Sequence, residues 1–399
     1  MFSPGRFTAL LGTVVLGAAL LPSTPVRADA DDLTVFAGTG GAGASGDGGP
    51  AANATLNHPT GVAVAADGTV YLSDGGNHTV RAVSPAGTIT TVAGTGRAGV
   101  PGRPVPDGVR GTGFDLVLPT SLAVGPDNVL YIADSGLFRV LALTPDGRLS
   151  VVAGDGRRGG TGDRGPATEA TLGQLGGLAV GPDRTVYLGE TDNGRVRAVT
   201  PDGVITTVAG NGGTQVTAAG GPATAVPVPA PASLAVDGDG AVWIGSGLLV
   251  HRLSGGRVAT VVRTGGDGGG GWGLAEDQTW PPARTPVNNV SAVAAGPDGI
   301  YLLDQQDRTV RRLGAGDAVT EVATLPSTGG PAAGPVAVGA SGTAYLVDSA
   351  GNRVYAFLPS AAPAPETDRG GLPWWPFVAG AAVLVLLGGW VTRRLRRNR

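Results

Sequence analysis

The sequence predicts an all-β fold, a six-bladed β-propeller closed by an N-terminal fourth strand, with one added C-terminal transmembrane helix. Three observations predict the propeller. The 71 glycines and 31 prolines among 399 residues indicate many tight turns. One pattern of short strands recurs six times along the chain. A strand that matches the end of this pattern stands before its first copy.

The recurring unit is a set of up to four short strands. An alternating apolar strand comes first, then a strand that begins with an aromatic residue and has a polar residue three positions later, then a third and usually a fourth strand. The second strands read YLSD at 71–74, YIAD at 131–134, YLGE at 187–190, WIGS at 243–246, YLLD at 301–304 and YLVD at 345–348. Alternation with period two, bounded by Gly, Pro and Asp, indicates strands, and four strands per unit are typical of a propeller blade.

The number of fourth strands predicts that the ring is closed. The sixth unit has none, because after Phe357 the chain continues through Pro359 into an Ala/Pro-rich segment. A segment with the fourth-strand pattern, Leu33–Gly38, instead precedes the first unit. We expect it to complete the sixth blade and so to remove the exposed edge that an open array would keep.

The two ends of the chain predict export and membrane anchoring. Arg6, an apolar run from Phe7 to Leu21 and small residues at Ala28 and Ala30 have the layout of a signal peptide cleaved after one of these alanines. An uncleaved anchor is the alternative. The predicted division is signal peptide 1–30, propeller 31–358, Pro/Ala-rich linker 359–373, transmembrane helix 374–391 and basic cytoplasmic tail 392–399.

The C-terminal apolar span has the length and flanks of a membrane-crossing helix. Eighteen residues at a rise of about 1.5 Å cover about 27 Å, near the thickness of a hydrocarbon core. Tryptophans stand at its start and arginines collect after its end. Because positive charge favours the cytoplasmic side, we expect a single-pass protein of the cell membrane, with its N-terminal domain extracellular and its C-terminus cytoplasmic.

Composition and charge exclude several functions. The absence of cysteine excludes disulfides, zinc thiolate sites and cysteine nucleophiles. Without the residues of the signal peptide and the tail, 21 basic residues face 30 acidic ones, a net charge near −9. Nucleic acids and anionic lipids need a basic surface, so the outer domain is not expected to bind them.

The repeat resembles a known family. Its pattern of small-Ala-Val, Gly-Pro-Asp-Gly, Tyr-x-x-Asp, Asn-x-x-Val-Arg and Thr-Val-Ala-Gly is similar to NHL repeats over about residues 33–358. The insert Gly-Asp-Gly-Gly-Pro-Ala at 46–51 resembles the linker between bacterial and teneurin-like NHL copies. The resemblance implies a six-bladed propeller but no particular activity, since NHL propellers include protein-binding, RNA-binding and enzymatic members. The fourth unit departs from the pattern at Ser246 and the fifth at Gln305 and Gln306.

The candidate site is a ring of polar residues that end the second strands. Because strands alternate in direction, these residues share one face with the long connections 94–119, 154–176 and 264–290. Carboxylates at the mouth of a channel could bind Ca²⁺, another divalent ion or a polar ligand. Asp and Asn there could equally cap turns through backbone amides, and both interpretations stay open. The candidate ligand-binding residues are Asp74, Asn77, Asp134, Glu190, Asn193, Asp304, Asp348 and Asn352.

Other candidate chemistry is sparse. Asp47, Asp163 and Asp267 lie in glycine-rich loops that could contribute to calcium binding, although none completes a calcium loop. The three histidines, His58, His78 and His251, have no companion pattern of catalytic residues, so no catalytic residue and no resident metal or cofactor is predicted.

We therefore expect a non-enzymatic binding or scaffold module at the cell surface. Its predicted partner is an extracellular protein, a peptide or a cell-wall glycan. The alternative is a propeller hydrolase or lyase that acts on sugars or peptides with a divalent ion bound in the channel.

Overall fold

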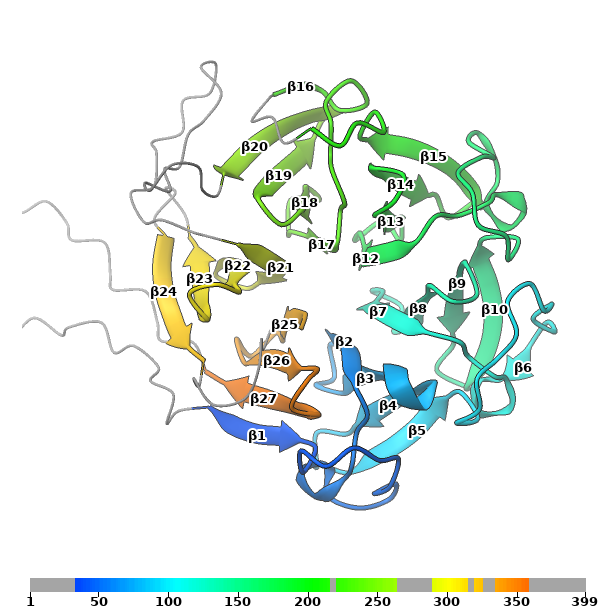
Figure 1. The fold of residues 1–399 in the computed structure, drawn as a ribbon, viewed down its shortest axis with the longest axis vertical. Helices are drawn as coiled ribbons and strands as arrows, with labels where there is room; N and C mark the ends of the chain where they lie inside the picture. The colour runs from blue at the N-terminus through cyan, green and yellow to red at the C-terminus, as the bar shows by residue number, and fades with distance from the viewer. Residues whose placement is uncertain (1–32, 216–219, 264–288, 315–318, 326–333, 359–399) are drawn as a thin grey trace, which may run out of the picture. The chain divides into compact units, whose positions relative to one another are not determined.

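The computed structural model confirms the six-bladed propeller. It describes residues 33–215, 220–263, 289–314, 319–325 and 334–358, which belong to one compact unit spanning residues 27–360. Six antiparallel sheets stand around a central axis, each with its first strand innermost (Figure 1). Blades are numbered here in the order in which their first strands occur along the chain.

Each blade has the four strands that the repeat predicts. Blade 1 has β2 (Pro59–Val64), β3 (Val70–Asp74), β4 (Thr79–Val83) and β5 (Ile89–Ala93). Blade 2 has β7 (Pro119–Val124), β8 (Leu130–Asp134), β9 (Arg139–Leu143) and β10 (Arg148–Ala153). Blade 3 has β12 (Leu175–Val180), β13 (Val186–Glu190), β14 (Arg195–Val199) and β15 (Val204–Ala209). Blade 4 has β17 (Ser233–Val236), β18 (Val242–Gly245), β19 (Leu249–Ser254) and β20 (Arg257–Arg263). Blade 5 has β21 (Val290–Gly296), β22 (Gly299–Asp304), β23 (Thr309–Leu313) and β24 (Val319–Thr324). Blade 6 has β25 (Val336–Val338), β26 (Ala344–Asp348), β27 (Arg353–Phe357) and β1 (Thr34–Ala37).

The N-terminal strand closes the ring as predicted. Strand β1 pairs antiparallel with β27, in the register Thr34 to Ala356 and Val35 to Tyr355, and Figure 1 shows the two strands side by side at the outside of blade 6. The two ends of the propeller sequence therefore share one sheet, which satisfies the backbone groups that an open edge would expose.

A glycine contact explains why the fourth strands end in Ala-Gly. Gly38 has φ of +91°, and a Cβ there would lie 2.3 Å from the carbonyl oxygen of Asn352. Three other blades repeat this close approach, at Gly94 to the His78 oxygen (2.2 Å), Gly154 to the Phe138 oxygen (2.2 Å) and Gly210 to the Gly194 oxygen (2.3 Å). The closing strand thus makes across the two ends of the chain the same contact that the other blades make internally.

Short outer strands form a feature that the sequence pattern did not predict. Strands β6 (Val109–Arg110), β11 (Gly165–Pro166) and β16 (Gly221–Pro222) pair with the fourth strands β10, β15 and β20. In blade 1 the insert at 46–51 lies in the same place, through a bridge between Pro50 and Thr88. These glycine-rich inserts cover the outer edge of the blade that follows them, so this part of the long connections protects sheet edges.

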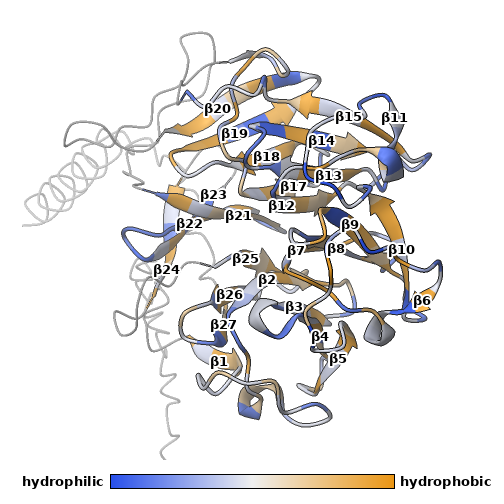
Figure 2. Cartoon of the chain, turned by 45° about the vertical axis from the view of Figure 1, so that its right-hand side comes forward, coloured by the Kyte–Doolittle hydropathy of each residue, from blue (hydrophilic) through white to orange (hydrophobic). Residues whose placement is uncertain are grey.

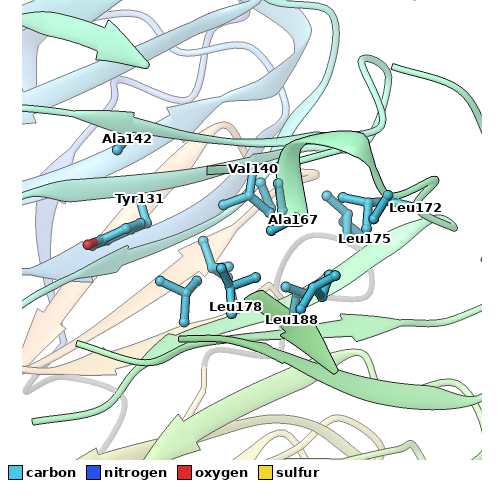
Figure 3. Close-up of a cluster of buried hydrophobic side chains, with 14 of the residues drawn as sticks. Tyr131, Val140, Ala142, Ala167, Leu172, Leu175, Leu178 and Leu188 are labelled. Carbon is cyan, nitrogen blue, oxygen red and sulfur yellow. The ribbon is translucent and has the colours of Figure 1, made fainter. Parts of the chain in front are cut away.

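The core is divided among the blade interfaces. Six clusters of buried apolar side chains each join two neighbouring blades, and apolar residues follow the strands while many turns are polar (Figure 2). Between blades 2 and 3, Leu178 and Leu188 face Tyr131 and Val140, with Leu172 beside them (Figure 3). The burial of these faces holds the blades together.

The predictions for the two ends of the chain fall on residues 1–30 and 359–399, outside the described residues. Within the described part of the chain, no helix is long and apolar enough to cross a membrane. The signal peptide, linker and transmembrane helix therefore stay predictions.

Closure predicts a large effect of Gly38→Ala. A left-handed alanine costs about 1–2 kcal/mol by itself, and a Cβ at position 38 must also displace the Asn352 backbone. Gly96→Ala is the matched control, because Gly96 has φ of +81° and open space around its Cβ position. In guanidinium unfolding followed by circular dichroism, we expect Gly38→Ala to lose at least about 2 kcal/mol more than the control. Equal losses would contradict a closure that depends on this contact.

Candidate functional site

The central channel opens to the face of the long connections through a small polar mouth. A cavity of about 140 Å³ lies between the six innermost strands. Its upper wall consists of Thr60, Thr120, Ser121, Gly176, Ala232, Ser233, Ser291, Gly334 and Pro335. Its floor has one apolar side chain from each blade, namely Val62, Leu122, Leu178, Leu234, Val293 and Val336. The same six side chains also line a second cavity of about 170 Å³, which has a rim of valines and alanine on its far side.

Hydroxyl groups around the mouth connect neighbouring blades. The Thr60 hydroxyl donates to the Pro119 carbonyl at 2.7 Å, which joins blade 1 to blade 2. The Ser233 hydroxyl accepts from the Val293 amide at 2.9 Å, which joins blade 4 to blade 5. Equivalent bonds run from Ser135 to Leu175 and from Ser349 to Pro59. The described part of the mouth is therefore an uncharged ring of hydroxyl and backbone groups joined by hydrogen bonds between blades.

The predicted carboxylates lie on the same face but are buried inside their own blades. Asp134 is fully buried and accepts four backbone N–H groups, from Val117 and Leu118 at 2.8 Å and from Gly136 and Leu137 at 3.1 and 3.0 Å. Two of these donors belong to the connection from blade 1 and two to the turn after β8. Burial raises the pKa of Asp134, although the four N–H groups act in the opposite direction. One carboxylate thus fixes both the turn and the incoming connection.

Blades 1, 3 and 5 repeat the bond to the incoming connection, whereas in blade 6 the described contact of Asp348 is with the Gly351 amide of its own turn. Asp74 accepts from the Asn57 amide and the Asn77 side chain, both at 2.7 Å. Glu190 accepts from the Gly173 amide and the Asn193 side chain. Asp304 accepts from the Asn289 amide, and Asp348 accepts from the Gly351 amide. Asn77 and Asn193 also donate to Gly43 and Gly159, and Asn352 accepts from the His58 amide.

These contacts are those of capped turns. None of the eight predicted residues lines the cavity at the mouth. The structure places them on one face without bringing them together around a common point. Their ligand-binding role stays a prediction, while their contacts give them a structural one.

Arginines of the third strands accompany the carboxylates in three blades. Arg81 pairs with Asp74 at 3.4 Å and Asp47 at 2.6 Å. Arg197 pairs with Glu190 at 3.5 Å and Asp163 at 2.8 Å. Arg311 pairs with Asp304 and Asp307, both at 3.0 Å.

Two of these arginines occupy aspartates that the sequence suggested as calcium ligands. Asp47 and Asp163 are held by arginine, so they do not fit a cation site as they stand. Asp267 lies outside the described residues. Within the described part of the chain, no group of three or more His, Asp or Glu side chains is placed to hold a metal ion.

Blade 4 lacks both the carboxylate and the arginine. Three residues lead from Ser246 to the third strand at Leu249, whereas the equivalent step in the other blades takes five. The shorter turn is closed by the Ser246 amide donating to the Leu249 carbonyl at 2.9 Å. His251 replaces the arginine, is fully buried and contacts the Thr260 hydroxyl at 3.1 Å. Burial lowers the pKa of His251 to about 4, so it is neutral at physiological pH.

Comparisons with known proteins agree with the repeat. The family model described as the Teneurin NHL domain matches residues 28–161. Teneurin-m of Drosophila melanogaster is 36% identical over 177 residues, which cover 41% of this chain and 6% of that protein. The match to this relative thus spans only a small part of its length.

Solved structures show the same fold at low identity. An auxiliary nutrient binding protein from Bacteroides thetaiotaomicron has a TM-score of 0.52 at 11% identity and covers 81% of this chain and 75% of its own. A gluconolactonase from Xanthomonas campestris has a TM-score of 0.50 at 13% identity and covers 77% and 87%. At these identities the likeness concerns the fold alone.

The ion pair of Asp163 predicts a pH-dependent stability. Burial would raise the pKa of Asp163, but hydrogen bonds from Thr207 and the charge of Arg197 outweigh it and lower the pKa. A carboxyl with a lowered folded pKa stabilises the fold above its unfolded pKa, near 4, and loses this contribution as pH falls through the folded value. Because the side chain is 37% exposed, we expect Asp163→Asn to cost on the order of 1 kcal/mol at pH 7.

Thermal unfolding between pH 7 and pH 3 measures this effect. The difference between wild type and Asp163→Asn should shrink below pH 4. Asp202→Asn, at an exposed turn position, is the control and should show no such difference at either pH. A loss for Asp163→Asn that is the same at pH 7 and pH 3 would argue against the ion pair as its cause.

Proposed function

We propose that this chain, an NHL-repeat β-propeller similar to the teneurin NHL domain, is a non-enzymatic binding or scaffold module. The observation that carries the proposal is the chemistry of the channel mouth. Its described lining consists of hydroxyl, backbone and apolar groups, and the acidic side chains nearby are engaged in holding turns and connections. Such a surface can recognise polar groups by hydrogen bonding but offers no acid or base for catalysis.

The size of the mouth supports a macromolecular partner. Pockets that enclose small ligands commonly measure about 300–1,000 Å³. A cavity of about 140 Å³ instead fits a protruding side chain or one sugar group of a larger molecule. We propose an extracellular protein, a peptide or a cell-wall glycan as the partner. The acidic balance of the exported part disfavours nucleic acid.

The proposed location is the outer face of a cell membrane. It rests on the signal peptide predicted at residues 1–30 and the apolar span predicted at 374–391. The Pro/Ala-rich residues 359–373 would then separate the propeller from the bilayer. Long connections and the polar mouth share one face, which is where a surface partner would be met.

A hydrolase or lyase with a channel-bound divalent ion is less well supported. Divalent ions in such sites need several carboxylate, imidazole or carbonyl ligands. The described lining of both channel cavities contains no carboxylate and no imidazole side chain, so it offers a divalent ion only neutral oxygen ligands.

A mouth-filling substitution tests the proposal. Ala232 is exposed and lines the mouth, so Ala232→Trp should block it with little effect on stability. Ala340→Trp, in an exposed turn between β25 and β26 on the opposite face, is the control. Thermal unfolding is measured with soluble glycans, peptidoglycan fragments, peptides, divalent ions and EDTA. We expect one polymer or peptide class to raise the unfolding temperature. Its apparent affinity should fall at least tenfold in Ala232→Trp and stay unchanged in Ala340→Trp.

Two other outcomes would contradict this proposal. Stabilisation by a divalent ion that EDTA reverses, together with turnover of a lactone or glycan, would favour the enzyme. Binding that is unchanged by Ala232→Trp would place the partner away from the mouth.

A further inference from the structure

A third cavity lies between blades 4 and 5, on the face of the short turns. It measures about 320 Å³ and opens to solvent. Blade 4 contributes Asp237, Asp239, Trp243 and Arg252, and blade 5 contributes the apolar side chains of Ile300 and Leu313. Its volume is within the range of pockets that enclose small ligands.

Three of these residues depart from the repeat at matching positions. Where blade 4 has Asp237, the other blades have Ala65, Gly125, Gly181, Gly296 and Gly339. Where blade 4 has Trp243, the others have Tyr71, Tyr131, Tyr187, Tyr301 and Tyr345. Where it has Arg252, four others have Ala82, Ala142, Ala198 and Ala356, while blade 5 has Arg312. Four blades have small residues at the positions of both Asp237 and Arg252, so the scaffold does not itself require this set.

The three residues form one cluster around the guanidinium of Arg252. The indole Nε1 of Trp243 donates to Asp237 Oδ2 at 2.8 Å, and the same oxygen lies 3.9 Å from Arg252 Nε. The Arg252 guanidinium stands over the indole ring, 5.9 Å from its centroid. Asp237 Oδ1 is occupied by the amides of Asp239 and Ala241. Asp237 and Trp243 therefore lie against one side of the guanidinium.

The guanidinium keeps donors available to the cavity. Its side chain is 28% exposed, and Asp237 is its only polar partner among the described residues. By contrast, Arg312 at the matching position of blade 5 is 2% exposed and bound to Asp298. An arginine held from one side, with its terminal nitrogens free, is suited to a planar anion that accepts two parallel hydrogen bonds.

The opposite wall is apolar and recessed. Ile300 and Leu313 are directly paired across β22 and β23 and are each 5% exposed. The turn before β22 is one residue shorter than in the other blades, and Gly296 pairs with Gly299 across it. The short turn and its glycines leave the crevice open beside the apolar wall.

We propose that this crevice binds a carboxylate that carries a branched apolar group. Arg252 binds the carboxylate, and the apolar group packs against Ile300 and Leu313. The ligand is either the C-terminus of a peptide that ends in an aliphatic residue or a small branched carboxylic acid. The site lies on the face opposite to the channel mouth, so it is independent of the function proposed above.

Calorimetric titration of the full chain tests the site with three probes. N-acetyl-leucine has the carboxylate, the branched group and a peptide-like amide. 4-Methylpentanoate has only the first two, and N-acetyl-leucinamide replaces the carboxylate with a neutral amide. We expect N-acetyl-leucine to bind and N-acetyl-leucinamide to bind at least tenfold more weakly. Equal binding of 4-methylpentanoate identifies a small acid as the ligand, and preference for N-acetyl-leucine identifies a peptide C-terminus.

Substitution by the residue of the other blades gives a variant that should fold. Arg252→Ala copies Ala82, Ala142 and Ala198 and should weaken N-acetyl-leucine binding at least tenfold with a nearly unchanged thermal midpoint. Arg252→Lys keeps the charge without the planar fork and should bind with intermediate affinity. Arg148→Ala removes an arginine whose side chain is 56% exposed in blade 2 and should bind like wild type.

Three results would overturn the proposal. They are no binding of either carboxylate to the wild-type chain, equal binding of the neutral amide, and binding that Arg252→Ala leaves unchanged.

Discussion

The ring depends on one carboxylate buried at the end of the second strand of nearly every blade. At Asp134 this group accepts two N–H groups from its own turn and two from the connection that arrives from the preceding blade. A buried carboxylate is costly unless its oxygens are fully bonded. Bonding therefore holds the turn, the connection and the first strand in one arrangement. Asp74, Glu190 and Asp304 likewise accept an amide from the connection that enters their blade, so this contact sets four of the six blades against the previous one.

This constraint decides what the channel face can offer a partner. The acidic residues of the repeat are already hydrogen-bonded to backbone groups of the fold. Two of them, Asp74 and Glu190, also form ion pairs with Arg81 and Arg197. The groups left at the mouth are hydroxyls such as those of Thr60 and Ser233, which also join blades. Recognition at this face consequently rests on hydrogen bonding and shape, and the polar residues of the repeat say more about the fold than about the ligand.

The sequence was sufficient for the features that repeat. The six blades could be predicted from the alternating strands, and the closure from the position of Leu33–Gly38 before the first blade. Both features depend on a pattern that repeats along the chain. The outer strands such as Gly165–Pro166 were not foreseen, since two residues rich in Gly and Pro carry no alternation. The cavity of Arg252 was missed because its walls come from two blades. Placing Asp237 and Arg252 in register with the Gly and Ala of other blades would have shown both as departures.

In blade 4, residues that depart from the repeat change together with the residues that they contact. The fold therefore stays intact. At the mouth, the turn after β18 is two residues shorter, so no extended turn needs a carboxylate, and His251 takes the place of an arginine that would have no acid to meet. On the other face, Asp237 stands where blades 2 and 3 have a glycine, and it bonds the indole that replaces a tyrosine. The added arginine then rests on that indole. Since the repeated residues meet the needs of the scaffold, the combination of Asp237, Trp243 and Arg252, which only blade 4 has in full, is where a function particular to this chain is best sought.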